Sequence, residues 1–281
     1  MEQRTAAVSV RNVTKRFGPV LANDKVCLDI YRGEILALLG ENGSGKTTLM
    51  NMLSGIYYPD EGEIYINGKP VSISSPKESF HLGIGMIHQH FKLVDVFTAA
   101  ENIILGLDEK LDMKSAIRKI RKICDQYGFD IDPNQKIYDM SVSQKQTIEI
   151  IKVLYRGADI LILDEPTSQL DPIAASDFLA VLGKINRELG TTVLLTEHRL
   201  EEAFPLATTV AVMDGGRLLC TGTPAEVGQR LKAMSHRMFL AMPAAMRIWA
   251  AVESDAPCPV TVREGRDFLQ EFASLSLIHI S

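Results

Sequence analysis

Several features of membrane-spanning or secreted proteins are missing from this 281-residue sequence. No apolar run approaches the roughly 20 residues that span a bilayer, and the opening residues, MEQRTAAVSV, lack the apolar core of a signal peptide. The four cysteines show neither disulfide-framework nor zinc spacing; they are Cys27, Cys124, Cys220 and Cys258. A reduced, cytoplasmic setting is therefore expected. Any membrane role is expected to act through a partner.

A strong basic charge is missing too. Lys and Arg total 30 against 35 for Asp and Glu, a formal net charge of -5, so nucleic acid is not an expected partner. Hydrophobic residues make up 46% of the chain, which is ample for the core of one large domain or two modest ones. We therefore expect a globular protein.

Alternating strands and helices predict the fold class. Apolar runs of the buried-strand type occur at 35–39, 160–163 and 192–195, and a helix is expected at 47–53. Another helix is predicted between the last two runs, capped by Asp171 with Pro172 at its first position and ended by Gly190. This order predicts an α/β fold with a mostly parallel, helix-covered sheet and ligands at the carboxyl ends of its strands.

Two further helical regions are predicted. From about residue 93 to 149, apolar residues recur at helical spacing opposite a basic face that is either solvated or in contact with acidic lipid or a partner; they are Met113, Ile117, Ile120 and Ile123. A second helical stretch, rich in Met and Ala, starts after Gly222-Thr223-Pro224 and is broken by Pro257 and Pro259. We predict a main domain over 1–222 that contains the helical insert, and a helical extension over 223–274.

A phosphate-binding loop follows the first buried strand. It is formed by Gly40, Glu41, Asn42, Gly43, Ser44, Gly45, Lys46 and Thr47, with Thr48 adding a second hydroxyl. Its glycines let backbone N–H groups curl around a β-phosphate, and the N-terminus of the next helix adds partial positive charge. Lys46 is expected to reach the β- and γ-phosphates, and Thr47 to bind Mg²⁺. The pattern predicts a magnesium-nucleotide site.

Two adjacent acids follow the strand at 160–163, in the run LILDEPTSQLDP. Like charges at the mouth of a buried strand resist desolvation, so a fold that keeps them there is expected to use them. Asp164 suits a metal ligand, and Glu165 suits the base that orients and deprotonates water. The alternative is an acidic turn before Pro166.

With these motifs, the chain resembles the ATP-binding subunits of ABC transporters over nearly its whole length. The resemblance implies ATP and Mg²⁺ as cofactors and a P-loop NTPase (RecA-like) core of the ABC ATPase type, with a helical subdomain insert and an N-terminal β subdomain. It implies that Phe17 stacks on adenine, that Gln89 touches the metal and senses the membrane partner, and that His198 contacts the γ-phosphate. Ser168 to Asp171 matches the loop that crosses the dimer interface, which places Asp171 with the nucleotide site.

The family signature, LSGGQ, corresponds here to Met140-Ser141-Val142-Ser143-Gln144. Ser141 and Gln144 are expected to form a capping box at a helix N-terminus. In the family, this N-terminus contacts the γ-phosphate of the nucleotide that is bound to the opposite subunit. Ser143 replaces the second glycine and adds a side chain where a close backbone approach is needed, so we hypothesise weak or asymmetric hydrolysis.

The subfamily that the sequence motifs resemble changes along the chain. Residues 57–155 resemble ATPases of simple-sugar and nucleoside importers, whereas the part after Thr167 resembles energy-coupling-factor ATPases. A chimera and a natural sequence of intermediate character are both open. Leu275 to Ser281 resembles the translation of a transposon-end adapter from sequencing libraries; a biological tail is the alternative, and the gene is expected to continue past Ala273 into a second such domain.

The resemblance implies an ATP-binding and ATP-hydrolysing subunit that energises an importer, for simple sugars or nucleosides, from the cytoplasmic face of the membrane. Membrane permease subunits and a second ABC ATPase domain are the expected partners. An energy-coupling-factor ATPase for vitamin or metal uptake is the first alternative. Another class, soluble ABC proteins of DNA repair or translation, carries long coiled coils or a charged linker that this sequence lacks. The third alternative is a non-functional composite, a chain joined from two proteins whose halves did not evolve to pack together.

Overall fold

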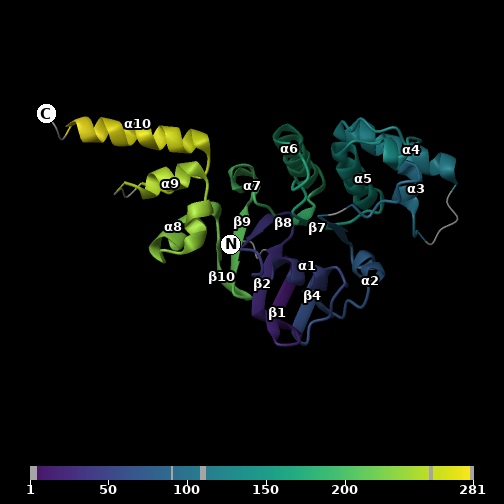
Figure 1. Ribbon diagram of the computed structural model, residues 1–281, viewed down its shortest axis with the longest axis horizontal. Coiled ribbons are helices and arrows are strands. Elements are labelled where there is room, and N and C mark those ends of the chain that lie inside the picture. The colour runs from purple at the N-terminus through teal and green to yellow at the C-terminus, as the bar shows by residue number, and fades with distance from the viewer. Residues whose placement is uncertain (1–4, 90, 108–111, 253–255, 279–281) are drawn as a thin grey trace.

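A computed structural model describes residues 5–89, 91–107, 112–252 and 256–278 of the protein, the last four of these by their backbone (Figure 1). Its central sheet has six strands in the order β10-β9-β3-β8-β7-β6, all parallel except the β9–β10 pair. The strands are β3 (Ile35–Leu39), β6 (Ile84–Ile87), β7 (Ile160–Asp164), β8 (Thr192–Thr196), β9 (Thr209–Asp214) and β10 (Arg217–Gly222). Every residue of β3, β7 and β8 is buried, as expected for strands covered on both faces. The three strands predicted from apolar runs are confirmed.

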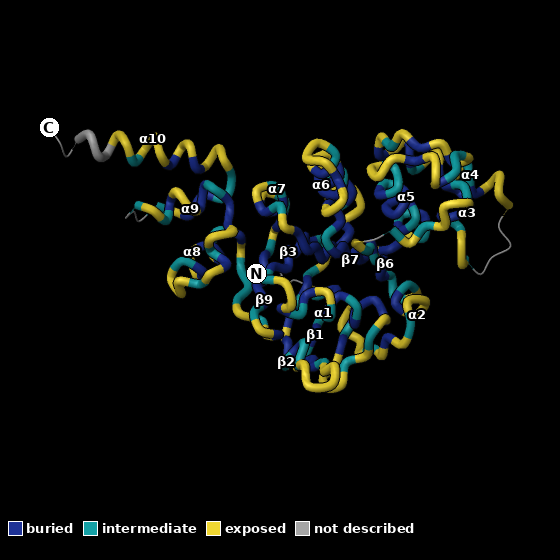
Figure 2. The backbone as a smooth tube through the Cα atoms, in the orientation of Figure 1, coloured by how far each residue is buried: buried dark blue, intermediate teal, exposed yellow. Residues whose placement is uncertain are grey.

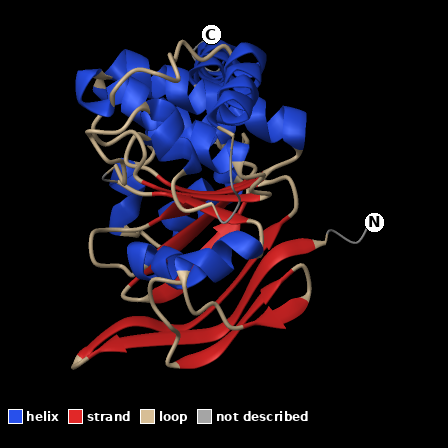
Figure 3. Ribbon diagram, turned by 90° about the vertical axis from the view of Figure 1, so that its right-hand side faces the viewer, coloured by secondary structure: helices blue, strands red, loops and turns tan. Residues whose placement is uncertain are grey.

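A second, antiparallel sheet carries the N-terminus and has the order β2-β1-β4-β5. Its strands are β1 (Ala6–Phe17), β2 (Val20–Tyr31), β4 (Glu61–Ile66) and β5 (Lys69–Val71). Helix α1 (Lys46–Leu53) lies between the two sheets, where Leu49, Met50 and Leu53 join a core shared by both (Figure 3). This packing fixes the loop that precedes α1 at the carboxyl end of β3, an interior strand of the central sheet.

The opposite face of the central sheet is covered by α6 (Pro172–Leu189) and α7 (Leu200–Leu206). Figure 2 shows the buried backbone concentrated where these helices meet the strands. Asp171 caps α6 by accepting hydrogen bonds from two backbone N–H groups, and Gly190 ends it at φ 66°. Both predicted helix ends are confirmed.

A helical region lies beside the β6 edge of the sheet and has its own apolar core. It contains α3 (Ala99–Ile104), α4 (Met113–Tyr127), the short turn η1 (Ile137–Asp139) and α5 (Val142–Tyr155), and α2 (Pro76–His81) lies before β6. Of the four apolar residues predicted on one face of α4, Ile120 is buried and Ile117 and Ile123 are partly buried. Met113 departs from this face, because it directly follows the cap, Asp112, and is 37% exposed. The buried face is completed by Ala116, Cys124 and Tyr127.

The C-terminal segment packs against the other edge of the central sheet, where Leu231, Met246 and Trp249 join a core with β9 and α7. It contains α8 (Pro224–Ala233), η2 (Arg237–Ala241), α9 (Ala244–Ala250) and α10 (Val262–Ile278). The break predicted around the prolines is confirmed, since α9 ends before them and α10 begins after them. Of the tail predicted at 275–281, residues 279–281 lie outside the described residues. None of the helices described is both long and apolar enough to cross a membrane.

Candidate nucleotide site

The loop at Gly40–Gly45 joins β3 to α1 and has a shape that requires glycine. Gly40, Gly43 and Gly45 have φ values of 155°, 82° and 97°. A Cβ on Gly40 would lie 2.5 Å from the carbonyl oxygen of Met213, and one on Gly45 would lie 2.3 Å from that of Ala22. The loop therefore fits closely against β9 and β2. It leads into the N-terminus of α1, whose backbone N–H groups receive no side-chain cap within the described residues and are available to a ligand.

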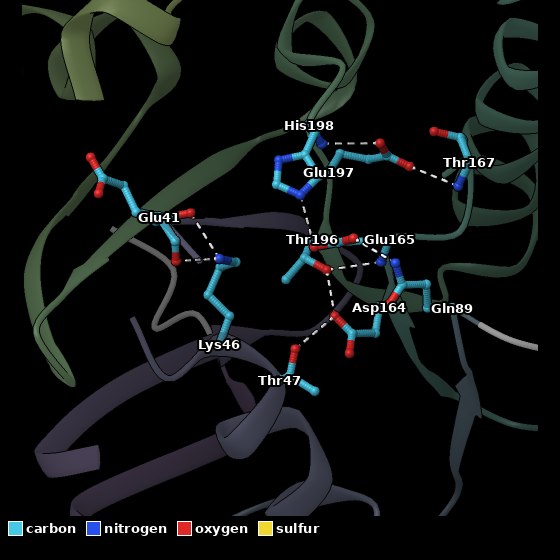
Figure 4. A network of polar contacts seen from close by, with 11 residues as sticks. Glu41, Lys46, Thr47, Gln89, Asp164, Glu165, Thr167, Thr196, Glu197 and His198 are labelled. Atoms are coloured by element: carbon cyan, nitrogen blue, oxygen red, sulfur yellow. Dashed lines mark hydrogen bonds and ion pairs between the residues drawn. The ribbon is translucent and has the colours of Figure 1, made fainter. Parts of the chain in front are cut away.

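Lys46 directly follows this loop as the first residue of α1 and is 7% exposed. Its Nζ donates hydrogen bonds to the carbonyl oxygens of Gly40 and Glu41, at 2.8 and 2.9 Å (Figure 4). Burial lowers the pKa of Lys46, and the carboxylates of Glu165 and Asp164 oppose that shift by favouring the charged form. The ammonium group is thus held among the loop, β7 and the chain after it, where a polyphosphate could replace its carbonyl partners.

Asp164 ends β7 beside Thr47, the second residue of α1. Thr47 Oγ1 lies 3.4 Å from Asp164 Oδ1, and Thr196 Oγ1 donates to the same oxygen at 2.9 Å. Thr196 also accepts a hydrogen bond from the backbone N–H of Glu165 at 2.9 Å. Because Asp164 and Thr196 are register partners in parallel strands, β8 fixes the end of β7. Sequence reasoning missed Thr196, whose position at the end of its strand, like that of Asp164, was the available signal.

Glu165 has φ 49°, a left-handed conformation that is rare outside glycine and is often found at functional sites. This turn directs its carboxylate to side chains that follow β6 and β8. Gln89 Nε2 donates to Glu165 Oε2 at 3.0 Å, and His198 Nε2 lies 2.8 Å from Glu165 Oε1. Figure 4 shows these three side chains converging beside Asp164. The structure thus brings together residues from four predicted motifs.

Glu197 is a second residue that sequence reasoning left out of the site. It is 7% exposed, and burial raises the pKa of its carboxyl group. Its two oxygens accept hydrogen bonds from the backbone N–H groups of Thr167 and His198, at 3.1 and 3.2 Å. The side chain therefore joins the loop after β7 to the residue that contacts Glu165. An acid next to a predicted γ-phosphate ligand was the signal in the sequence.

The oxygen-rich side chains at this point fit a magnesium ion bound with phosphate. Thr47, Asp164 and Gln89 offer a hydroxyl, a carboxylate and an amide oxygen, the ligand types that Mg²⁺ prefers. Within the described ranges, no group of three or more His, Cys, Asp or Glu side chains could hold a metal alone. A site with few protein ligands suits Mg²⁺, which keeps waters and substrate phosphates. Ser44 Oγ is buried without a partner among the described residues and could donate to a phosphate.

Phe17 ends β1 and is 42% exposed. Its ring meets that of Tyr57 edge-on, with 5.1 Å between centroids, and Lys15 Nζ lies 5.5 Å from the ring centre. These contacts orient an aromatic ring that remains accessible to solvent. The adenine contact of Phe17 stays a prediction.

The signature residues lie apart from this cluster, at the N-terminus of α5 in the helical region (Figure 1). The predicted capping box is confirmed: Ser141 accepts from the backbone N–H of Gln144, whose side chain accepts from that of Ser141. Ser143 is exposed at the second helical position. Asp171 uses its carboxylate to cap α6. Nucleotide contacts by Ser141, Ser143, Gln144 and Asp171 stay predictions.

Comparison with known proteins places this arrangement in a family. Residues 23–168 match the sequence profile of the family described as ABC transporter. The nucleoside import ATP-binding protein NupA of Lactococcus lactis is 47% identical over 218 residues, which are 76% of this chain and 43% of NupA. The chain thus spans less than half the length of this curated relative.

Two solved structures share the fold at low sequence identity. CbiO1 from Clostridium perfringens, part of the ABC transporter complex cbiONQ, is 26% identical with a TM-score of 0.70 over 84% of this chain and 98% of CbiO1. A dimeric structure of MJ0796, a bacterial ABC transporter cassette, is 25% identical with a TM-score of 0.67 over 77% of this chain and 98% of that cassette.

Proposed function

Because this chain belongs to the ABC transporter family, we propose that it binds and hydrolyses ATP with Mg²⁺ to energise an importer. The observation that carries this proposal is the convergence of Lys46, Asp164 and Glu165 at the carboxyl ends of β3 and β7, with Gln89 and His198 on either side of Glu165. A phosphate-binding loop alone would support nucleotide binding. The oriented second carboxylate adds the means for hydrolysis.

Each side chain has a defined task in this proposal. The loop amides and Lys46 would hold the β- and γ-phosphates. Thr47, Asp164 and Gln89 would hold Mg²⁺, which would supply positive charge beside the transferred phosphoryl group. Glu165 accepts a proton from the attacking water, and the contacts from Gln89 and His198 fix its carboxylate. Asp164 is kept in place by Thr196, so the two neighbouring acids have separate tasks.

The proposed setting is the cytoplasmic face of a membrane, with membrane permease subunits and a second ABC ATPase domain as partners. The absence of a spanning helix in the described part of the chain fits attachment through permeases. The dimeric cassette MJ0796 supports pairing of two such domains. Nucleosides or simple sugars are the proposed substrates, supported by the 47% identity to a nucleoside import protein.

A second candidate is an ATPase of the energy-coupling-factor type. Two motifs after Thr167 resemble that class, Ser168-Gln169-Leu170-Asp171 and Pro259–Arg266. The similarity to CbiO1 also favours it. Both candidates use the same ATP chemistry and differ in the membrane partner. Co-purification with the permease subunits of each class would separate them.

The proposed ATPase activity is tested by titrating the purified chain with MgATP in a calorimeter and measuring phosphate release. We expect Lys46→Ala to remove measurable ATP binding and hydrolysis, because the buried ammonium is the cation of the loop. Lys114→Ala, which removes an exposed lysine of α4, is the matched control and should leave both unchanged. Wild-type protein that neither binds ATP nor releases phosphate would refute the proposal.

A further inference from the structure

The C-terminal segment touches the phosphate loop through one arginine. Arg237 begins η2, and its Nε lies 2.7 Å from Glu41 Oε1 in the loop. A terminal nitrogen of the same guanidinium lies 3.5 Å from Asp214 Oδ1, at the end of β9. Two parts of the molecule that are far apart in sequence thus meet beside the nucleotide site.

The turn that carries Arg237 is held in place by its neighbours. His236 Nδ1 accepts a hydrogen bond from the backbone N–H of Met238 at 3.2 Å, and His236 Nε2 lies 3.4 Å from Asp214 Oδ2. Met238 is 9% exposed and packs in the core that β9 shares with the C-terminal helices. The contacts of His236 and Met238 therefore fix the backbone from which Arg237 extends, while the ion pairs of the guanidinium place its end beside Glu41 and Asp214.

Glu41 places a carboxylate in a loop built for a polyanion. Its own carbonyl oxygen accepts from Lys46 Nζ at 2.9 Å, which puts its backbone beside the cation of the site. Charges in water interact over a Debye length of about 8 Å at physiological salt, so an unpaired carboxylate here would oppose a triphosphate. An open pocket of about 590 Å³ lies between the loop and η2 and is lined in part by Glu41, Arg237 and His198.

We propose that Arg237 is a positioning residue of the phosphate loop: it neutralises Glu41 and holds that carboxylate toward η2, away from the phosphates. The guanidinium lies closer to Glu41, at 2.7 Å, than to Asp214, at 3.5 Å, and only Glu41 belongs to the loop. The main effect of Arg237 is therefore exerted through Glu41. The C-terminal segment thereby sets the affinity of the loop for nucleotide.

This inference rests on the proposed function, and a double-mutant cycle in the full chain tests it. MgATP dissociation constants are measured by calorimetry for the wild type, Arg237→Gln, Glu41→Gln and the double variant. We expect Arg237→Gln to weaken binding about 3- to 5-fold, in keeping with up to about 1 kcal/mol for an exposed ion pair. In the Glu41→Gln background, the same change should cost less than about 2-fold, because the like charge is gone.

A matched control separates this local effect from a general loss of positive charge. Arg263 is also an exposed arginine of the C-terminal segment, and it pairs with Asp267 within α10. Arg263→Gln changes net charge equally and should not alter ATP affinity. The loss caused by Arg237→Gln should also shrink at high salt.

Two results would overturn the inference: no change in affinity for Arg237→Gln, or an equal loss in both Glu41 backgrounds. Melting temperatures without nucleotide show whether a variant has failed to fold. A wild-type chain that does not bind ATP refutes the proposed function itself, whereas normal binding with an additive cycle refutes the role of Arg237 alone.

Discussion

The phosphate loop and the signature helix are both predicted to contact ATP, yet they differ in how much of their environment lies within this chain. Around the loop, Lys46 donates to carbonyl oxygens of the loop itself, and hydrogen bonds join Asp164 and Glu165 to side chains that follow or end other strands. At the start of α5, by contrast, Ser141 and Gln144 cap each other and face outward. In the site that we propose, folding of this chain assembles one half, and the other half would contact nucleotide bound to a second domain.

The largest expected effect is the loss of ATP hydrolysis when Glu165, in the cluster around the phosphate loop, is changed. Glu165→Gln keeps the shape of the side chain and removes the base, so turnover should fall at least about 100-fold while ATP still binds, as general-base catalysis is typically worth 10²–10⁴-fold. Single-turnover phosphate release and calorimetric titration measure the two properties separately. Turnover close to that of the wild type would show that another group accepts the proton.

A smaller loss of turnover is expected when the buried hydroxyl of Thr196, in the same cluster, is removed. Thr196→Val removes the hydrogen bonds to Asp164 and to the backbone of Glu165 without changing shape, so we expect about 1–3 kcal/mol lower stability and about tenfold slower turnover. Thr192→Val is the matched control, because Thr192 Oγ1 accepts from Gly33 N–H at the other end of β8. It should lose stability and keep its turnover per folded molecule. Equal loss of turnover in both variants would contradict a positioning role for Thr196.

These two variants also show where sequence reasoning stops. Lys46, Thr47 and the two acids at the end of β7 could be predicted, since each lies in a contiguous motif next to a strand with a clear apolar run. The partners of Thr196 could not, because they depend on the register between β7 and β8; its place at the end of an apolar strand indicated only that it lies at the carboxyl edge of the sheet. Arg237 depends on the packing of η2 against β9. Met113 was misplaced because periodicity does not show where a helix begins to pack.

The smallest effect concerns the outward-facing half. Ser143→Gly restores the glycine of the family signature, and we expect ATP turnover to rise about 2- to 5-fold, because a backbone without Cβ can approach a phosphate more closely. Ser143→Ala retains a Cβ and should give no rise. Helix stability should fall by up to about 1 kcal/mol, the cost of glycine in a helix, so turnover is compared per folded molecule. An unchanged rate of ATP turnover in Ser143→Gly would contradict the hypothesis that Ser143 weakens hydrolysis.

The most direct test of a divided site is the molecular mass of Glu165→Gln in solution, measured by light scattering with and without MgATP. If α5 supplies the second half in trans, the variant should be monomeric alone and dimeric with MgATP. Adding Ser141→Arg, which places a bulky side chain at the exposed cap, should abolish the dimer while ATP binding persists. A variant that binds ATP and stays monomeric, or an ATP-dependent dimer insensitive to Ser141→Arg, would contradict the account.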